Sequence, residues 1–274
     1  MAYSAPTSWQ GGAIPTLKLN DGNEIPMLAY GFGTANMGAY LNETGVGAGI
    51  KASGVAREKL YVATKVVGTH GQDVQAALAA SLEKLGVDYL DLYLVHIPWA
   101  ARSDEELQRI WAEMEAIKAS GKARSIGVSN FEQAELEVIL RTAKTVPAIN
   151  QVEYHPYLQH GDLLAFLREK NIAPASYSGL AAVTAARPGP LDDTYAELAR
   201  KYGVTESDVA LRWILDQGIV AVTTSGKGER LQGYLSKLPT FQLTEEEVKR
   251  ISEIGKQKHY KGLCEQYMRA QYCS

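Results

Sequence analysis

The sequence predicts an α/β fold built on a parallel sheet. Short aliphatic or β-branched runs alternate with segments in which apolar residues recur at three- and four-residue spacing. That alternation is typical of buried strands joined by amphipathic helices, and its repetition along the chain implies a parallel sheet. Glycines stand where the helices should stop, at Gly54, Gly86, Gly121, Gly203 and Gly218. A closed barrel and a doubly wound sheet both fit this pattern, but no GxGxxG segment opens a helix, so the dinucleotide-binding signature of the doubly wound sheet is missing.

The first predicted elements are the two strands of a β-hairpin at residues 14–28. IPTLKL and EIPML flank Asn-Asp-Gly, and Asn and Gly are the residues that a tight hairpin turn requires. Strands of the main sheet are then expected at seven places, at residues 27–33, 60–66, 90–95, 123–128, 148–153, 173–177 and 219–223.

The helices predicted between these strands carry apolar stripes and start signals. One stripe consists of Val74, Leu78, Leu82 and Leu85, and a second of Leu107, Ile110, Trp111, Met114 and Ile117. Ser103 with Glu106, and Thr244 with Glu247, have the spacing of capping boxes, which satisfy the free N–H groups at a helix start. Asn42 and Glu43 suit the start of an earlier helix.

The composition of the chain limits the classes of protein to which it can belong. The chain has 274 residues, 46% hydrophobic and 22% charged, enough for one large core, and we expect a single domain over residues 1–274. A net charge of −3 with mixed signs gives no indication of a nucleic-acid partner, and no apolar run is long enough for a membrane span. The first residues lack the layout of a signal peptide. Free thiols at Cys264 and Cys273, in a reducing, cytoplasmic setting, are favoured over the alternative of a disulfide between them.

Five short motifs contain the candidate catalytic and binding residues. They are YLNETGVG at 40–47, ATKV at 63–66, LVHIPW at 94–99, GVSNF at 127–131 and NQVEYHPY at 150–157. The last four stand at the ends of strand-like runs, where a barrel would deliver them to one mouth. They supply the phenol of Tyr40, the ammonium of Lys65, the imidazole of His96 and several amides and hydroxyls. This set suits protonation of a carbonyl beside a bound nicotinamide.

Each residue also has a purely structural interpretation when it is taken alone. Tyr40 could be an aromatic at a loop–helix junction, Lys65 a lysine at the rim of the sheet, and His96 a hydrogen-bonded core histidine. For His155 the structural interpretation is favoured. Neither His96 nor His155 has the spacing of a metal site, so no metal is expected.

The order and spelling of the motifs resemble the aldo-keto reductase family, over about residues 14–254. The resemblance implies a (β/α)₈ TIM barrel with an N-terminal β-hairpin. It also implies NADPH-dependent reduction of a small-molecule ketone or aldehyde. Tyr40 would be the proton donor, Lys65 and His96 would tune and orient it, and Trp99 would line the substrate pocket. A monomer or weak homodimer is expected.

The resemblance also assigns the cofactor contacts. Ser129, Asn130 and Gln151 correspond to residues that hydrogen-bond the nicotinamide carboxamide, and Tyr177 to the aromatic that stacks on the ring. Further cofactor-binding candidates are Gly33 and Thr34 in GFGT, Ser178 and Leu180 in SYSGL, and Ser225, Lys227 and Arg230 in TTSGKGER. The two cations favour the 2′-phosphate of NADPH over NADH. Tyr234 stands where the family has an adenine-binding asparagine. The TTS-x-K and VHIPW spellings are similar to fungal carbonyl reductases that act on α-keto amides, ketopantoyl lactone and conjugated polyketones.

One expected part is missing. In the family a helix and a strand, ending in a catalytic aspartate, separate the GFGT turn from the tyrosine motif. Here GFGT ends at Thr34, and the next six residues end at Tyr40, which is too short for both elements. Either the barrel lacks one βα unit between residues 34 and 40, or a segment is missing from the numbering. In the former case the opening lies between the first strand and the strand at 60–66. An alternative function follows: a repurposed barrel that binds NADP(H) but performs non-redox chemistry such as cyclisation, or is catalytically impaired.

Overall fold

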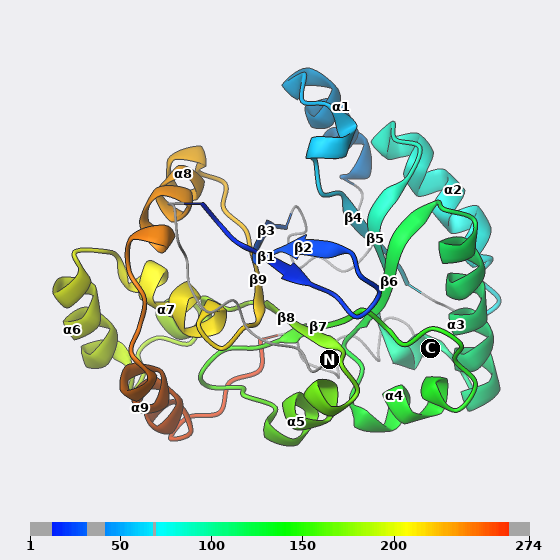
Figure 1. Ribbon diagram of the computed structural model, residues 1–274. Coiled ribbons are helices and arrows are strands. Elements are labelled where there is room, and N and C mark those ends of the chain that lie inside the picture. Colours follow the sequence, from blue (N-terminus) through cyan, green and yellow to red (C-terminus); the bar gives the residue numbers. More distant parts are fainter. Residues whose placement is uncertain (1–12, 32–41, 68–69, 263–274) are drawn as a thin grey trace.

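The computed structural model describes residues 13–31, 42–67 and 70–262. A curled sheet of parallel strands lies at the centre, helices surround it, and a separate two-stranded hairpin crosses one end (Figure 1). The strands are β1 Thr16–Lys18, β2 Glu24–Pro26, β3 Leu28–Tyr30, β4 Ala63–Val66, β5 Leu90–Val95, β6 Ala123–Ser129, β7 Ile149–Glu153, β8 Ala173–Tyr177 and β9 Val220–Thr223.

The helices follow the strands in alternation, as the hydrophobic periodicity predicts. They are α1 Glu43–Ser53, α2 Val74–Leu85, α3 Asp104–Ala119, α4 Gln133–Leu140, α5 Gly161–Glu169, α6 Asp192–Tyr202, α7 Glu206–Leu215, α8 Gly228–Lys237 and α9 Glu245–Gly255. Short 3₁₀ turns lie at Arg57–Lys59, Pro98–Ala100, Ala181–Val183 and Leu238–Thr240. None of the described helices is long and apolar enough to cross a membrane.

The order of strands in the sheet is β3-β9-β8-β7-β6-β5-β4. The seven predicted strands are thus confirmed, and β3 and β4 form the two ends of the sheet in the part of the chain that the structure describes. Among the described strands, the two ends of the sheet are therefore the two that were predicted to flank the opening. Exposure agrees with this order: Tyr30 in β3 is 38% exposed and Ala63 in β4 is exposed, whereas every residue of β5 and β7 is buried.

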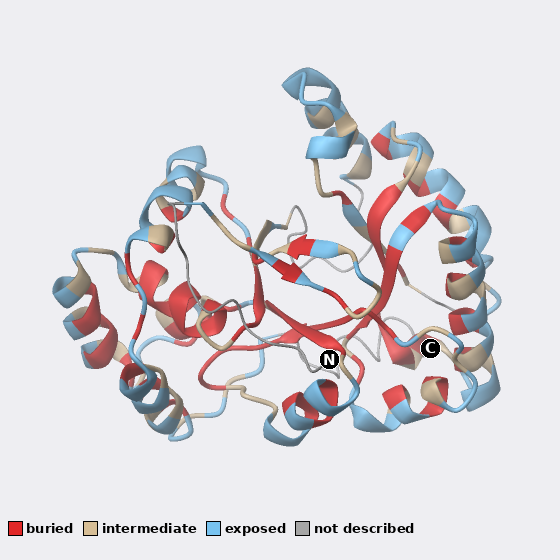
Figure 2. Ribbon diagram, in the orientation of Figure 1, coloured by how far each residue is buried: buried red, intermediate tan, exposed pale blue. Residues whose placement is uncertain are grey.

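The core lies between the sheet and the helices that cover it (Figure 2). The predicted stripe of α3 is buried at all of its positions, and in α2 Val74, Leu78 and Leu85 are buried while Leu82 is partly buried. Strands covered by helices on one face and by interior side chains on the other bury both faces, which explains the unbroken apolar runs in the sequence. β4 begins later than predicted because the N–H of Val62 donates to the Asp91 carboxylate at 2.8 Å and its carbonyl accepts from Asp91 N–H.

The β1–β2 hairpin closes the end of the sheet at which the strands begin. Asn20 Nδ2 donates to the carbonyls of Pro147 and Asn171, at 2.9 and 3.0 Å, just before β7 and β8. Asn23 Nδ2 donates to the Arg124 carbonyl at 3.1 Å, at the start of β6. Since the hairpin blocks this end, the opposite end, where the strands finish, is left for a functional site.

Two predicted helix caps differ from expectation. Thr244 and Glu247 form the predicted capping box, but only half of the other box forms: Ser103 accepts from Glu106 N–H, while the Glu106 carboxylate accepts from Arg102 N–H instead of from Ser103. Asn42 precedes α1 without a side-chain cap. Gly33, Thr34, Tyr40, the segment 35–39, Cys264 and Cys273 lie outside the described residues.

Candidate active site

Lys65 and His96 lie at the ends of adjacent strands. Lys65 belongs to β4. His96 follows β5, and its main-chain N–H donates to the Val66 carbonyl at 2.7 Å. Burial, and to a smaller extent the nearby Lys65 ammonium, lower the pKa of His96 from 6.5 to about 3. The imidazole is therefore neutral at physiological pH, so it can donate a hydrogen bond from one ring nitrogen and accept with the other.

A row of hydrogen bonds joins the ends of three strands. The Tyr177 hydroxyl, at the end of β8, donates to Asn130 Oδ1 at 2.6 Å. Asn130 Nδ2 in turn donates to the His96 carbonyl at 3.0 Å and to Ser129 Oγ at 3.2 Å. Asn130 adopts a left-handed backbone with φ 62°, which asparagine tolerates better than most residues. The contacts of Asn130 with His96 and with Tyr177 bring together predicted residues that lie 34 and 47 positions apart in the sequence.

Ser129 and Gln151 lie beside Asn130 at the neighbouring strand pair. Ser129 in β6 and Gln151 in β7 are partners in the sheet register. The Ser129 hydroxyl donates to the main-chain carbonyl of Gln151 at 2.7 Å. The Asn130 N–H donates to the same carbonyl at 2.9 Å. The three residues assigned to the nicotinamide carboxamide are thus held by the same polar network.

Ser178 and Leu180 follow Tyr177 on the loop after β8. Ser178 is exposed with φ 55°, and Leu180 is partly buried against the core. The left-handed residue turns the chain sharply as it leaves the strand. β9 is the next strand of the sheet beside β8.

The Thr223–Arg230 segment after β9 supplies the predicted cations. Lys227 N–H donates to Ser225 Oγ at 3.0 Å, and Arg230 N–H donates to the Lys227 carbonyl at 3.1 Å, so Lys227 is the N-cap residue of α8. Both cationic side chains are exposed, and neither forms an ion pair with a described residue. Ser225 itself is buried, and its carbonyl accepts from the Tyr30 hydroxyl at 2.7 Å.

Trp99 lies in the 3₁₀ turn Pro98–Ala100, just after His96. It packs in a small apolar cluster with Ile97 and Ala100 from its own loop and with Val67, which follows β4. The predicted pocket residue therefore lies between the loops that follow Lys65 and His96.

Other residues singled out in the sequence have structural surroundings. His155 is fully buried, 3.2 Å from Glu153 Oε1. Tyr234, in the place of the adenine-binding asparagine, is 3% exposed and belongs to the core. No cluster of three or more His, Cys, Asp or Glu side chains within the described ranges could hold a metal ion.

The sequence did not reveal two residues whose side chains hydrogen-bond to loops at the candidate site. Tyr30 holds the Ser225 loop, and Glu106 holds the loops after β4 and β5. Tyr30 immediately precedes the GFGT turn, which could have signalled a role beside the cofactor. The position of Glu106 in a capping box concealed its other contacts.

Comparisons with known proteins show what the chain as a whole is similar to. Residues 29–256 match the model of the aldo/keto reductase family. The chain is 33% identical over 288 aligned residues to aldehyde reductase YPR1 of Saccharomyces cerevisiae, covering 88% of this chain and 91% of that protein. It is 34% identical over 224 residues to an NAD/NADP-dependent indole-3-acetaldehyde reductase of Schizosaccharomyces pombe, with coverage of 80% and 78%.

A solved structure extends the likeness to three dimensions. The crystal structure of the Bombyx mori aldo-keto reductase AKR2E4 in complex with NADP has a TM-score of 0.79 and 33% identity, covering 88% of this chain and 93% of that one. The alignment with the yeast reductase is longer than the 274 residues of this chain, so that protein contains residues without a counterpart here.

Proposed function

Because the chain belongs to the aldo-keto reductase family, we propose that it reduces the carbonyl group of a small ketone or aldehyde with NADPH. The observation that carries the proposal is the hydrogen-bonded row from Tyr177 through Asn130 to His96, with Lys65 beside His96. The proposal is supported because the neutral imidazole of His96, Lys65 and the amide of Asn130 lie at neighbouring strand ends.

The donor set fits a nicotinamide cofactor. The polar groups of Ser129, Asn130 and Gln151 can bind a carboxamide, which needs both donors and acceptors, and the Tyr177 ring offers a flat face to the nicotinamide. When bound, the reduced cofactor supplies the hydride for the carbonyl carbon. Lys227 and Arg230, exposed at the start of α8, would bind the anionic end of the cofactor.

The proton is assigned to Tyr40, on the strength of the motif alone. A phenol close to an ammonium gives up its proton more easily, and the neutral imidazole of His96 can hold the carbonyl oxygen by a hydrogen bond. Trp99, beside His96, would line the substrate pocket. The substrates include the α-keto amides and related carbonyl compounds of the fungal reductases that the motifs resemble. We further propose that the protein is cytoplasmic, consists of a single domain and is a monomer or weak homodimer.

The second candidate is a barrel that binds NADP(H) without reducing carbonyls. It is favoured by the short segment between Thr34 and Tyr40, which has no room for the strand that carries the family aspartate. Consumption of NADPH with a panel of α-dicarbonyl compounds separates the two candidates. Cofactor binding without turnover would favour the second.

The role of Tyr40 is tested by Tyr40→Phe. We expect turnover to fall below detection while the Kd for NADPH stays within about twofold, because only the phenol proton is removed. Tyr202→Phe is the matched control, since its hydroxyl bonds Glu247 on the outer helices. Near-normal turnover in Tyr40→Phe would show that another group or a water molecule supplies the proton.

The preference for NADPH is tested by Arg230→Ala and Lys227→Ala. Charge-assisted hydrogen bonds contribute about 1.5–3 kcal/mol, so each variant should bind NADPH at least roughly tenfold more weakly with little change for NADH. Lys237→Ala, at the other end of α8, is the control. Equal NADPH and NADH affinities in the unmodified protein, measured by fluorescence titration, would contradict the preference.

A further inference from the structure

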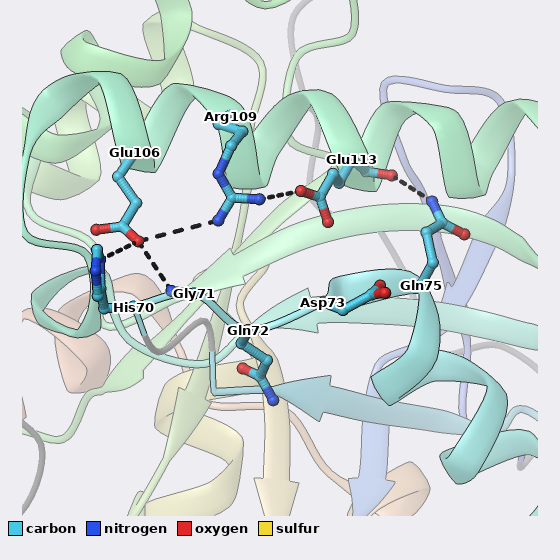
Figure 3. A pocket seen from close by; sticks show the side chains of 8 residues that line it. All are labelled: His70, Gly71, Gln72, Asp73, Gln75, Glu106, Arg109 and Glu113. Carbon is cyan, nitrogen blue, oxygen red and sulfur yellow. Dashed lines mark hydrogen bonds and ion pairs between the residues drawn. The ribbon is translucent and has the colours of Figure 1, made fainter.

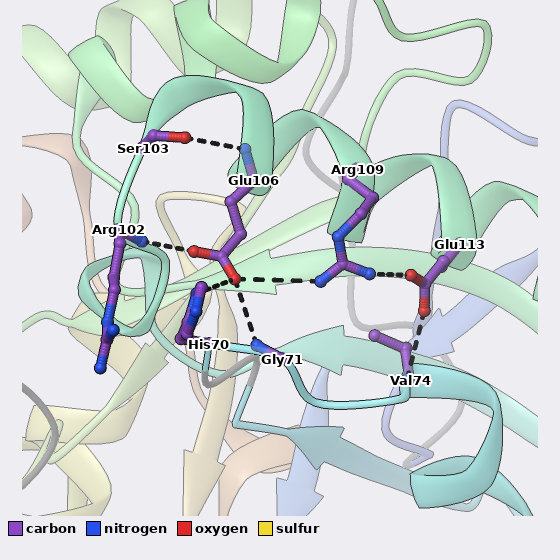
Figure 4. Close-up of polar contacts among 8 residues, drawn as sticks. All are labelled: His70, Gly71, Val74, Arg102, Ser103, Glu106, Arg109 and Glu113. Carbon is purple, nitrogen blue, oxygen red and sulfur yellow. Dashed lines mark hydrogen bonds and ion pairs between the residues drawn. The ribbon is translucent and has the colours of Figure 1, made fainter.

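A cluster of polar side chains on α3 contacts the connection between β4 and α2. Glu106 Oε1 lies 2.8 Å from His70 Nδ1 and accepts from Gly71 N–H at 3.3 Å, while Oε2 accepts from Arg102 N–H at 2.7 Å (Figure 4). The side chain of Glu106 is only 11% exposed. The hydrogen bond from Arg102, together with those from His70 and Gly71, holds the pKa of this carboxyl below its ordinary value. Glu106 is therefore ionised over the neutral pH range.

The same face of α3 continues through Arg109 to Glu113. Arg109 forms an ion pair with Glu113 and lies 3.9 Å from Glu106, so it bridges the two carboxylates (Figure 3). Glu113 accepts from Val74 N–H at 3.2 Å, and its carbonyl accepts from Gln75 Nε2 at 3.3 Å. Glu106 and Glu113 are thus similar in charge and share Arg109, but outside α3 the contacts that Glu113 makes among the described residues are with Val74 and Gln75, in the first turn of α2.

The contacts of Glu106 join two connections that leave the proposed site. Gly71 lies on the connection after β4, which carries Lys65, and Arg102 lies on the connection after β5, which carries His96 and Trp99. Each carboxylate oxygen holds one connection. The apolar cluster of Val67, Ile97, Ala100 and Trp99 belongs to the same two connections.

The position of β4 makes this junction important. Within the ranges that the structure describes, β4 pairs only with β5, so one side of the strand that carries Lys65 has no sheet neighbour. A strand with one ladder is held by fewer hydrogen bonds than a central strand. Contacts outside the sheet therefore have a larger share in setting where Lys65 lies relative to His96.

We propose that Glu106 is a positioning residue for carbonyl reduction. It fastens the connection after β4 to the connection after β5, and so keeps Lys65, His96 and Trp99 in their working arrangement. The inference rests on the proposed reductase function. It assigns to Glu106 no contact with substrate or cofactor.

The test compares Glu106→Ala, Glu106→Gln and Glu113→Ala, with NADPH and phenylglyoxal as probes. We expect Glu106→Ala to lower kcat/KM at least tenfold, mainly through kcat, with the Kd for NADPH within twofold, because none of the proposed cofactor-binding residues lies on the connections after β4 and β5. Glu106→Gln should recover part of kcat, since the amide oxygen still accepts one N–H. Glu113→Ala should lower the unfolding midpoint but leave kcat/KM within twofold.

Amide hydrogen exchange gives a readout independent of turnover. In Glu106→Ala, the amides of Gly71 and Arg102 should both exchange faster, whereas Glu113→Ala should affect only the region of Val74. The inference would be overturned, while the proposed function stands, if Glu106→Ala had the same kcat/KM as Glu113→Ala. It would also be overturned if exchange became faster at only one of Gly71 and Arg102. A wild-type protein without turnover would sink both.

Discussion

At the scale of single residues, buried charge has the largest consequences. Arg212 is fully buried on α7 and forms an ion pair with Asp216, whose side chain is 3% exposed. Asp216 also accepts from Leu243 N–H at 3.0 Å. Burial raises the pKa of Asp216 from 3.8 to about 6, although Arg212 opposes that change. A pair of this kind is costly to break, because the remaining charge stays in the interior.

Replacing Arg212 by Met should therefore destabilise the protein by about 3–5 kcal/mol at pH 7. The cost should shrink toward pH 5, because the folded protein, with a raised Asp216 pKa, takes up the proton more readily than the unfolded chain. Urea unfolding at both pH values measures this. The double variant Arg212→Met with Asp216→Leu should lie closer to wild type, and a double variant as unstable as the single one would contradict the explanation.

A second prediction at the residue scale concerns His96, and here acidification lowers the free energy of unfolding. Its pKa is lowered to about 3, so the folded state resists protonation that the unfolded chain accepts below about pH 6.5. The stability that depends on the neutral ring is complete above pH 6.5 and falls as the pH drops toward 3. Between pH 7 and pH 4 the loss should be ~3 kcal/mol, at about 1.4 kcal/mol per pKa unit.

The His96 prediction is measured as a difference between two proteins, because other groups titrate in the same range. The free energy of unfolding of wild type should decline more steeply with acidification than that of His96→Gln, which has no titrating ring. Parallel pH profiles would mean that the imidazole is already solvated or charged in the folded protein.

At the scale of elements, the packing of α1 depends on one glycine. α1 has no buried residue and contacts α2 closely (Figure 1). A methyl group on Gly47 would lie 2.4 Å from the Lys84 carbonyl oxygen and 2.8 Å from that of Leu85, both backbone atoms at the end of α2. Glu43 adds a hydrogen bond from Thr64 Oγ1 at 2.8 Å, which connects the start of α1 to β4.

Gly47→Ala and Gly49→Ala should consequently have opposite effects. Alanine at 47 must displace α1, at a cost of about 1–3 kcal/mol that exceeds its helix-propensity gain. Gly49 has open space around the position of a methyl group, so alanine there should stabilise by up to about 1 kcal/mol. Urea midpoints of the two variants test the pair. Stabilisation by both would show that α1 does not approach α2 this closely in solution.

At the scale of the whole molecule, the sheet is curled with β3 and β4 at its ends rather than paired with each other in the described residues. β4 is instead fastened near its start by Asp91, which is 5% exposed and lies between Arg57, at 2.8 Å, and Arg124, at 3.2 Å. Beyond its other end, Glu106 holds the following connection. Side-chain contacts thus help to hold β4 in place, as a second neighbouring strand would.

Hydrogen exchange should reveal this arrangement directly. Amides of β3 and β4 are expected to exchange faster than those of β6, β7 and β8, each of which has a strand on both sides. Peptide-resolved exchange measures the order. Equal protection of β4 and β7 would show that another segment or a second copy pairs with the end of the sheet, and light scattering would then distinguish the two.

Much of this architecture could be predicted from the sequence. Periodicity alone located the seven strands and the buried faces of α2 and α3, because burial of a strand or helix face leaves a local repeat in the chain. The shortage of residues between Thr34 and Tyr40 also predicted where the sheet would open. The family motifs predicted candidate site residues, and the structure joins five of these candidates, His96, Ser129, Asn130, Gln151 and Tyr177, in one network.

Other features required the tertiary structure, because they depend on distances between segments far apart in the chain. The pKa of His96 follows from its burial beside Lys65, 31 positions earlier by residue number. Glu106 satisfied a local capping pattern in the sequence, yet its carboxylate turned to Gly71 and His70 on another connection. The sequence by itself determined the elements and the chemical groups available, whereas only the folded chain decided which of those groups meet, since contact is a property of space and not of order.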